Sequence, residues 1–294
     1  MTDVPAITVI VPTYGRPGIA ARLVRALQAQ HLPGSESFEV IVVDDGSPVR
    51  VEVAAAGGDG PAVQVLRQQR QGPAAARNAG LEAARGELVA FIDDDCEPAP
   101  GWLAALRDGA RRHPGCGLGG HVVNQLRHNP FAEASQLIVT YLCDYYRDAS
   151  TWRFFTSNNL AFPRAGLQAR GGFDAAYTRA AGEDRELCDR WVALGGRLMA
   201  VPDAVVLHAH PLSWRTFLRQ HYEYGRGAWG YRCARAARAG APVRVEPWSF
   251  YRNLLMYPIR VHGWRGAWLT ALVGLAQTAN AVGFLVEAVR SRLA

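Results

Sequence analysis

The 294-residue sequence contains no lysine, so all 32 of its basic residues are arginine. It also contains no Cys-x-x-Cys pair, and its five cysteines stand singly, which argues against both a zinc site and a disulfide framework. The N-terminus has no basic flank, and the first apolar run, Ile7 to Val11, is far shorter than the core of a signal peptide. We therefore expect a cytoplasmic protein whose cysteines are small buried thiols.

The positive charge is concentrated in the C-terminal part of the chain. Residues 211–294 contain 12 Arg and 3 Glu, whereas residues 1–210 contain 20 Arg and 23 acidic residues. An Arg-rich surface fits nucleic acid, an anionic membrane surface or an anionic acceptor molecule. The composition thus predicts a basic extension beyond residue 210 and leaves the nature of its partner open.

Short apolar runs alternate with stretches in which apolar residues recur at helical spacing. The runs are 7–11, 38–43, 63–67 and 88–92. This alternation is typical of a mostly parallel sheet with helical crossovers. The sequence therefore predicts an α/β protein with a doubly wound sheet, and its 49% hydrophobic residues suffice for a full core.

Acidic residues follow two of these runs directly. Asp93, Asp94 and Asp95 come after the fourth run, Asp44 comes after the second, and the loop 12–17 follows the first. Open α/β sheets bind their ligands at the carboxyl ends of such strands. Because adjacent carboxylates repel one another and oxygen ligands suit Mg²⁺ and Mn²⁺, the triplet predicts a site for a divalent cation or a polyhydroxyl ligand. A solvated acidic turn is the alternative.

Further polar residues occur near the starts of predicted helices or directly after an apolar run. Arg77 lies in the first turns of an Ala-rich helix, where a guanidinium can meet a diphosphate or pair with the aspartates. Glu183 and Asp184 begin another helix, and the helix dipole alone favours carboxylates there. His208 and His210 follow a late apolar run and are candidate metal ligands.

Six short motifs, in this order, resemble those of the family 2 glycosyltransferases over about residues 6–210. They are Pro12-Thr13-Tyr14, Val43-Asp44-Asp45-Gly46-Ser47, Ala76-Arg77-Asn78-Ala79-Gly80, Asp93-Asp94-Asp95, Gly171-Gly172-Phe173-Asp174 and Gly182-Glu183-Asp184. The resemblance implies a GT-A fold, which is Rossmann-like. It also implies a catalytic domain over residues 1–210, with a nucleotide-sugar half over about 1–120 and an acceptor half over about 121–210.

The resemblance also implies roles for individual residues. The nucleotide would contact Pro12, Thr13, Tyr14, Arg16, Asp44, Arg77, Asp93 and Asp94. The metal, Mg²⁺ or Mn²⁺, would bind Asp95 and a histidine after the late strand, for which we favour His208 over His210. Asn158, Asn159 and Glu183 would contact the donor or acceptor sugar. The inverting members use the aspartate of the Glu-Asp pair as general base, which is Asp184 here.

The expected chemistry agrees with these roles. Departure of a nucleoside diphosphate builds negative charge that a divalent cation stabilises. A sugar hydroxyl is a poor nucleophile at neutral pH, so a carboxylate is needed to take its proton. We expect a UDP- or dTDP-type donor and a hydroxyl-bearing acceptor, and analogy points to envelope glycolipid, polysaccharide or natural-product glycosylation.

Residues 211–294 are expected to form a helical extension rich in aromatic residues. The segment from Trp214 to Trp229 is amphipathic, and its apolar face packs on the catalytic core or meets membrane headgroups. Gly266 to Val286 has no charge, but Gln277 and Asn280 make it a poor membrane span, so that an in-plane helical hairpin or an oligomer contact is favoured. Peripheral binding at the inner face of the plasma membrane, a lipid-linked acceptor and a homodimer stay open.

Three alternatives compete with an inverting glycosyltransferase. A retaining or nucleotidyl-transfer enzyme on the same fold would share the motifs. A non-catalytic scaffold that binds a nucleotide sugar or a membrane would not need both Asp95 and Asp184. A nucleic-acid binder explains the isoelectric point of about 9.3 but none of the carboxylates, so we expect no nucleic-acid partner.

Overall fold

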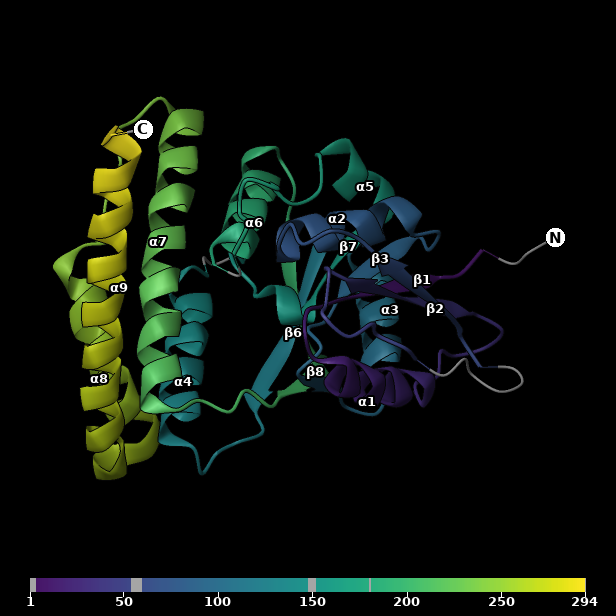
Figure 1. The fold of residues 1–294 in the computed structure, drawn as a ribbon, viewed down its shortest axis with the longest axis horizontal. Coiled ribbons are helices and arrows are strands. Elements are labelled where there is room, and N and C mark those ends of the chain that lie inside the picture. Colours follow the sequence, from purple (N-terminus) through teal and green to yellow (C-terminus); the bar gives the residue numbers. More distant parts are fainter. Residues whose placement is uncertain (1–3, 54–59, 148–151, 180, 294) are drawn as a thin grey trace.

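The computed structural model describes residues 4–53, 60–147, 152–179 and 181–293. At its centre lies a mixed sheet with the strand order β3-β2-β1-β4-β7-β6-β8-β5. Helices cover both faces of this sheet, and a layer of long helices lies beside it (Figure 1). The predicted α/β class with a C-terminal helical extension is confirmed.

The strands are β1 (Ile7–Thr13), β2 (Phe38–Asp44), β3 (Ala62–Arg67), β4 (Leu88–Phe91), β5 (Cys96–Pro98), β6 (Gly117–Asn124), β7 (Leu160–Pro163) and β8 (Leu198–His208). The helices around the sheet are α1 (Pro17–Gln28), α2 (Pro73–Ala83), α3 (Trp102–Arg112), α5 (Arg164–Ala169) and α6 (Glu183–Ala193). The helical layer contains α4 (Pro130–Tyr145), α7 (Trp214–Ala239), α8 (Trp248–His262) and α9 (Ala267–Leu293). Two 3₁₀ helices, η1 (Ser157–Asn159) and η2 (Gly263–Gly266), join these elements.

The N-terminal half of the sheet is parallel, since β1 pairs with β2 and β4, and β2 pairs with β3. Every residue of β1 and β2 is buried, as expected for parallel strands that are covered on both faces. Thr13 lies opposite Asp44 in the register of these two strands. The two strands therefore end together and bring the loops that follow them to one edge of the sheet.

Two apolar clusters fill the space between the sheet and its helices. Leu23 of α1 and Val9 belong to the cluster on one face, whereas Trp191 of α6 and Ile10 belong to the cluster on the other. Successive residues of a strand point to opposite faces, which is why Val9 and Ile10 belong to different clusters. The double core holds the sheet firmly, so the edge that carries the acidic loops has a fixed geometry.

The helices beyond β8 share a third apolar cluster with α4. It includes Ile138 of α4, Phe217 of α7, Phe250 of α8 and Leu272 of α9. Helices α7 and α9 lie side by side (Figure 1). The apolar face predicted for the segment from Trp214 onward is thus used mainly against other helices of this layer.

Among the described residues, the segment Trp248–Leu293 is long and apolar enough to cross a membrane by length and composition alone. Its most apolar window has a mean hydropathy of 1.6, and 22% of that window is buried. The uncharged run 266–286 lies in this segment, almost wholly within α9. Because α9 contacts α4, α7 and α8, it is placed as one helix of a packed layer.

Candidate active site

Apart from Arg77 of α2, the residues expected to bind a nucleotide lie at or just after the carboxyl ends of β1, β2 and β4. The Thr13 hydroxyl donates to Asp94 Oδ2 at 2.6 Å. Asp44 Oδ1 accepts from the Ser47 backbone at 2.8 Å, and its Oδ2 lies 3.3 Å from an Arg67 nitrogen. Tyr14 is 37% exposed. Three strands distant in sequence thus bring their terminal polar groups to one edge.

The acidic triplet is divided among different partners. Asp94 is 1% exposed, and its Oδ1 lies 2.5 Å from an Arg16 nitrogen. Burial raises the pKa of Asp94 to about 6, although Arg16 and the Thr13 hydroxyl oppose that shift. Asp93 is more open and lies 2.8 Å from Arg77. Asp94 therefore organises the loop, whereas Asp93 faces the space in front of the sheet.

Asp95 lies between two imidazoles at the carboxyl end of β8. Its Oδ1 is 3.4 Å from His208 Nε2, and its Oδ2 is 3.2 Å from His210 Nδ1. Arg16 donates to the same Oδ2 at 2.9 Å. Burial raises the pKa of Asp95, but the hydrogen bonds from His208 and His210 outweigh it and hold the pKa well below its usual range. Asp95 is thus a carboxylate at any ordinary pH.

Ligand atoms of Asp95, Cys96 and His208 lie within 4.8 Å of one another. Burial raises the pKa of the Cys96 thiol well above its usual value. Its soft sulfur also suits Mg²⁺ and Mn²⁺ less well than an oxygen ligand does. His210 Nε2 lies 2.8 Å from Gln220 Oε1 while its Nδ1 faces Asp95, so both of its ring nitrogens are engaged. The available donor set is a carboxylate and an imidazole, which fits a divalent cation such as Mn²⁺. The choice of His208 over His210 stays a prediction.

Arg77 joins the acidic triplet to the start of α6. It is 3% exposed, and its two terminal nitrogens lie 2.8 Å from Asp93 Oδ1 and 3.0 Å from Glu183 Oε1. Its Nε has no hydrogen-bond partner among the described residues. Of the two roles considered for Arg77, the structure contains the pairing with carboxylates, and the predicted contact with a nucleotide stays a prediction.

Asp184 occupies the first turn of α6. Gly182 precedes this turn with φ +90, and a side chain there would collide with the backbone of Gly227 in α7. This close approach holds the start of α6, and with it Asp184, against α7. Burial raises the pKa of Asp184, against a hydrogen bond from the Arg185 backbone and the charge of Arg77. Burial also raises the pKa of the neighbouring Glu183.

A cavity of about 940 Å³ lies between these residues and the helical layer. Eight of the residues expected in the site line it: Arg16, Arg77, Asp93, Asp95, Asn158, Glu183, Asp184 and His208. Pro12, Thr13, Tyr14, Asp44, Asp94 and Asn159 do not line it. The cavity therefore joins the predicted metal and base residues, while most of the predicted nucleotide contacts lie outside it.

The two asparagines of η1 differ in their surroundings. Asn158 lines the cavity, and its Oδ1 accepts from the Thr156 hydroxyl at 2.7 Å. Asn159 is 1% exposed; its amide nitrogen donates to the backbone of His121 and Ala204, and its oxygen accepts from Trp102. Because these bonds occupy both ends of its amide, Asn159 acts here as a tie between strands, and its predicted sugar contact is not supported by its position.

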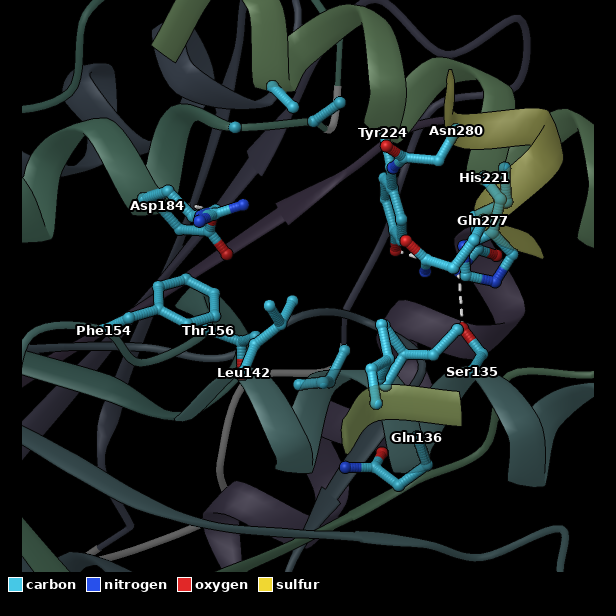
Figure 2. Close-up of a pocket in the computed structure, with 18 of the residues that line it drawn as sticks. Ser135, Gln136, Leu142, Phe154, Thr156, Asp184, His221, Tyr224, Gln277 and Asn280 are labelled. Atoms are coloured by element: carbon cyan, nitrogen blue, oxygen red, sulfur yellow. Dashed lines mark hydrogen bonds between the residues drawn. The ribbon is translucent and has the colours of Figure 1, made fainter. Parts of the chain in front are cut away.

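The far wall of the cavity is formed by residues that belong to none of the six sequence motifs. Tyr224, His221, Gln277 and Asn280 lie across the cavity from Asp184 (Figure 2). Gln220 connects this wall to the predicted metal site, since its amide nitrogen donates to Tyr224 Oη at 2.9 Å and its oxygen faces His210. The one sequence signal for this wall was the presence of polar residues in an otherwise apolar run, 266–286.

Solved structures with a similar fold identify its class. A mannosyltransferase from Pyrobaculum calidifontis, solved with GDP-Man and Mn²⁺, superposes with a TM-score of 0.57 at 23% identity, over 99% of this chain and 81% of that chain. GalNAc-T7 with UDP, GalNAc and Mn²⁺ gives a TM-score of 0.53 at 16% identity, over 97% of this chain and 56% of that chain. The fold is therefore the GT-A fold of nucleotide-sugar enzymes, as the motifs implied.

Sequence comparison assigns the chain to a family. The profile of Glycosyl transferase family 2 matches residues 8–180. The pre-mycofactocin glycosyltransferase of Mycobacterium tuberculosis is 34% identical over 230 residues, 76% of this chain and 46% of that protein. The chondroitin synthase of Escherichia coli is 26% identical over 243 residues, 71% of this chain and 35% of that protein. The chain belongs to glycosyl transferase family 2, and it spans less than half the length of these two relatives.

Proposed function

We propose that this protein is an inverting, metal-dependent glycosyltransferase that moves a sugar from a nucleoside diphosphate to an acceptor hydroxyl. Residues 1–210 form the catalytic domain in this proposal. The observation that carries it is the placement of Asp95 and Asp184 on one cavity, with Arg77 and Glu183 between them. An acidic metal-binding end and a separate carboxylate base are what a single displacement at the anomeric carbon requires.

Asp184 is the general base of the proposed reaction. It removes the proton of the acceptor hydroxyl while the acceptor oxygen forms a bond to the anomeric carbon. The bond from that carbon to the diphosphate oxygen breaks at the same time, and its electron pair leaves with the nucleoside diphosphate. Attack opposite to the leaving group inverts the configuration of the anomeric carbon.

Asp95 and His208 are the proposed metal ligands. Their oxygen and imidazole donors suit Mg²⁺ or Mn²⁺, and the strongly lowered pKa keeps Asp95 ionised for this role. A divalent cation bound there would stabilise the negative charge that develops on the departing diphosphate. Arg16 pairs with Asp95 and with the neighbouring Asp94, and it adds positive charge beside the proposed metal site.

Calorimetric titration of UDP, dTDP and GDP, with and without Mn²⁺, tests the donor site. GDP is included because the mannosyltransferase of similar fold was solved with GDP-Man. We expect binding of one nucleotide that depends on Mn²⁺, is lost in Asp95→Ala and is retained in Asp108→Ala, a control on the exposed side of α3. Failure of all three nucleotides to bind with Mn²⁺ present would contradict the proposal.

The stereochemistry of the product separates this proposal from a retaining enzyme. Once the donor is known, proton NMR of the first product gives its anomeric configuration. We expect the configuration opposite to that of the donor. Turnover of the donor by the wild type would also exclude a non-catalytic scaffold.

A further inference from the structure

His221 stands out on the far wall of the cavity. It lies in α7, is 1% exposed and lines the cavity. Its Nε2 is buried and has no hydrogen-bond partner among the described residues. Buried polar atoms are almost always hydrogen-bonded because leaving one unpaired costs free energy, so an unpaired nitrogen beside a cavity indicates a group that a ligand completes.

The imidazole of His221 is held in one orientation by aromatic neighbours. Its ring lies 4.6 Å from that of Phe217 and 5.5 Å from that of Tyr224, in edge-to-face arrangements. Burial lowers the pKa of His221 to about 4, so the ring is neutral near pH 7. A neutral imidazole has one nitrogen that accepts and one that donates, which suits an uncharged hydroxyl or amide partner.

Other polar groups on this wall also remain available. The Tyr224 hydroxyl accepts from Gln220, so its own proton is left for a further acceptor. Gln277 and Asn280 of α9 line the cavity next to these residues (Figure 2). These two amides are the side chains that make the run 266–286 a poor membrane span. Their position on the cavity allows them to hydrogen-bond a ligand there.

Apolar side chains line much of the cavity between its two ends. Leu142 and Phe154 lie along its lower side in Figure 2, below Asp184, and Ile138 of α4 also lines it. A molecule that reaches from Asp184 to His221 would therefore need polar groups at both ends and an apolar body between them.

We infer that His221 and Tyr224, with Gln277 and Asn280, bind a second polar group of the acceptor, which is an amphipathic molecule with its reactive hydroxyl at Asp184. This inference rests on the proposed function, because it takes Asp184 as the base that meets the acceptor. The helical layer then completes the acceptor site. It selects an acceptor by the polar group that lies at the opposite end from the reactive hydroxyl.

A pair of simple probes tests this inference. Octanediol, with a hydroxyl at each end, and octanol, with one, share the same apolar body. Binding is measured by NMR on protein carrying ¹⁵N-labelled histidine. We expect the wild type to bind the diol about threefold to tenfold more tightly than octanol, the gain of one neutral hydrogen bond, and the His221 Nε2 resonance to shift with the diol.

The variants assign the preference to the proposed wall. His221→Phe keeps an aromatic ring at this position but removes both ring nitrogens, and we expect this variant to bind the two probes equally. Tyr224→Phe should weaken the preference, which provides a second variant if His221→Phe folds poorly. His128→Phe, at an exposed position outside the cavity, should bind as the wild type does.

Equal binding of both probes by the wild type, an unchanged preference in both cavity variants, or no binding of either probe would overturn the inference. Nucleotide titration on the same samples separates the two proposals. If the wild type binds a nucleotide with Mn²⁺ but shows no preference for the diol, only the acceptor inference fails. If no nucleotide binds, the proposed function fails.

Discussion

The carboxylate of Asp184 lies in the first turn of α6 and on the wall of the cavity. If it takes the proton of the acceptor, Asp184→Asn removes the base but keeps the shape of the side chain. We expect the turnover number to fall by about 10²- to 10⁴-fold, with little change in nucleotide affinity. Radiolabelled transfer and calorimetry measure the two quantities.

Asp189→Asn is the matched control for that variant. It lies on the same helix, but its carboxylate pairs with Arg235 and Arg238, and none of these three residues lines the cavity. Turnover within about twofold of wild type is expected for this control. An Asp184→Asn enzyme with turnover like that of the control would show that another group takes the proton.

The environment of Asp184 also sets the pH dependence of the reaction. Burial raises the pKa of Asp184, and the base works only in its charged form. As the pH is lowered, turnover should therefore begin to fall at a higher pH than it would with an ordinary aspartate. At saturating donor and metal, the acidic limb of the turnover number is expected above the usual aspartate pKa of about 3.9. A limb at or below that value, in protein whose circular dichroism is unchanged, would contradict the assignment.

At the scale of helices, two glycines of α9 have opposite surroundings. A side chain at Gly283 would collide with the backbone carbonyl of Tyr222 in α7, whereas one at Gly274 would meet only Leu255 at 3.8 Å. Gly283→Ala should therefore lower the free energy of unfolding by about 1–3 kcal/mol, because the helices must separate. Gly274→Ala should raise it by about 0.5–1 kcal/mol, since alanine favours a helix interior. Urea unfolding measures both, and equal effects would refute the close contact between α7 and α9.

Some of these elements could be predicted from the sequence, and some residues of the site could not. The strands β1, β2 and β4 were predictable because each is a short apolar run, and the acidic residues that end them mark the edge where they meet. His221 was not, because its position on the apolar side of α7 looks the same whether it packs in a core or lines a cavity. The sugar contact expected for Asn159 came from the resemblance alone, which does not show that its amide bonds lie within the core. Such roles depend on which helices pack together, and short-range patterns do not contain that information.

Viewed as a whole, the molecule has a strongly asymmetric surface. The acidic site lies on the sheet region, while the helical layer carries the surplus of arginine and several exposed tryptophans. Trp264 of η2 is 90% exposed and Trp268 of α9 is 62% exposed, with Arg265 between them in sequence. Figure 1 places the C-terminus at the upper end of α9, so η2 and these tryptophans lie at its lower end. Exposed indole rings beside guanidinium groups are typical of contacts with the headgroup region of a bilayer.

Binding to anionic vesicles tests this surface. Each arginine near an anionic leaflet contributes about 1 kcal/mol, so the wild type should sediment with phosphatidylserine vesicles at low salt and be released as salt is raised. Trp264→Ser with Trp268→Ser should reduce the bound fraction severalfold, because both rings lose their apolar contact with the interface. Leu194→Ser removes an exposed apolar side chain on the sheet region, 56% exposed, and should leave binding unchanged. If the wild type stays in solution at low salt, the tryptophans and arginines of this layer do not form a membrane contact, and a partner protein or a second copy of the chain becomes the explanation for their exposure.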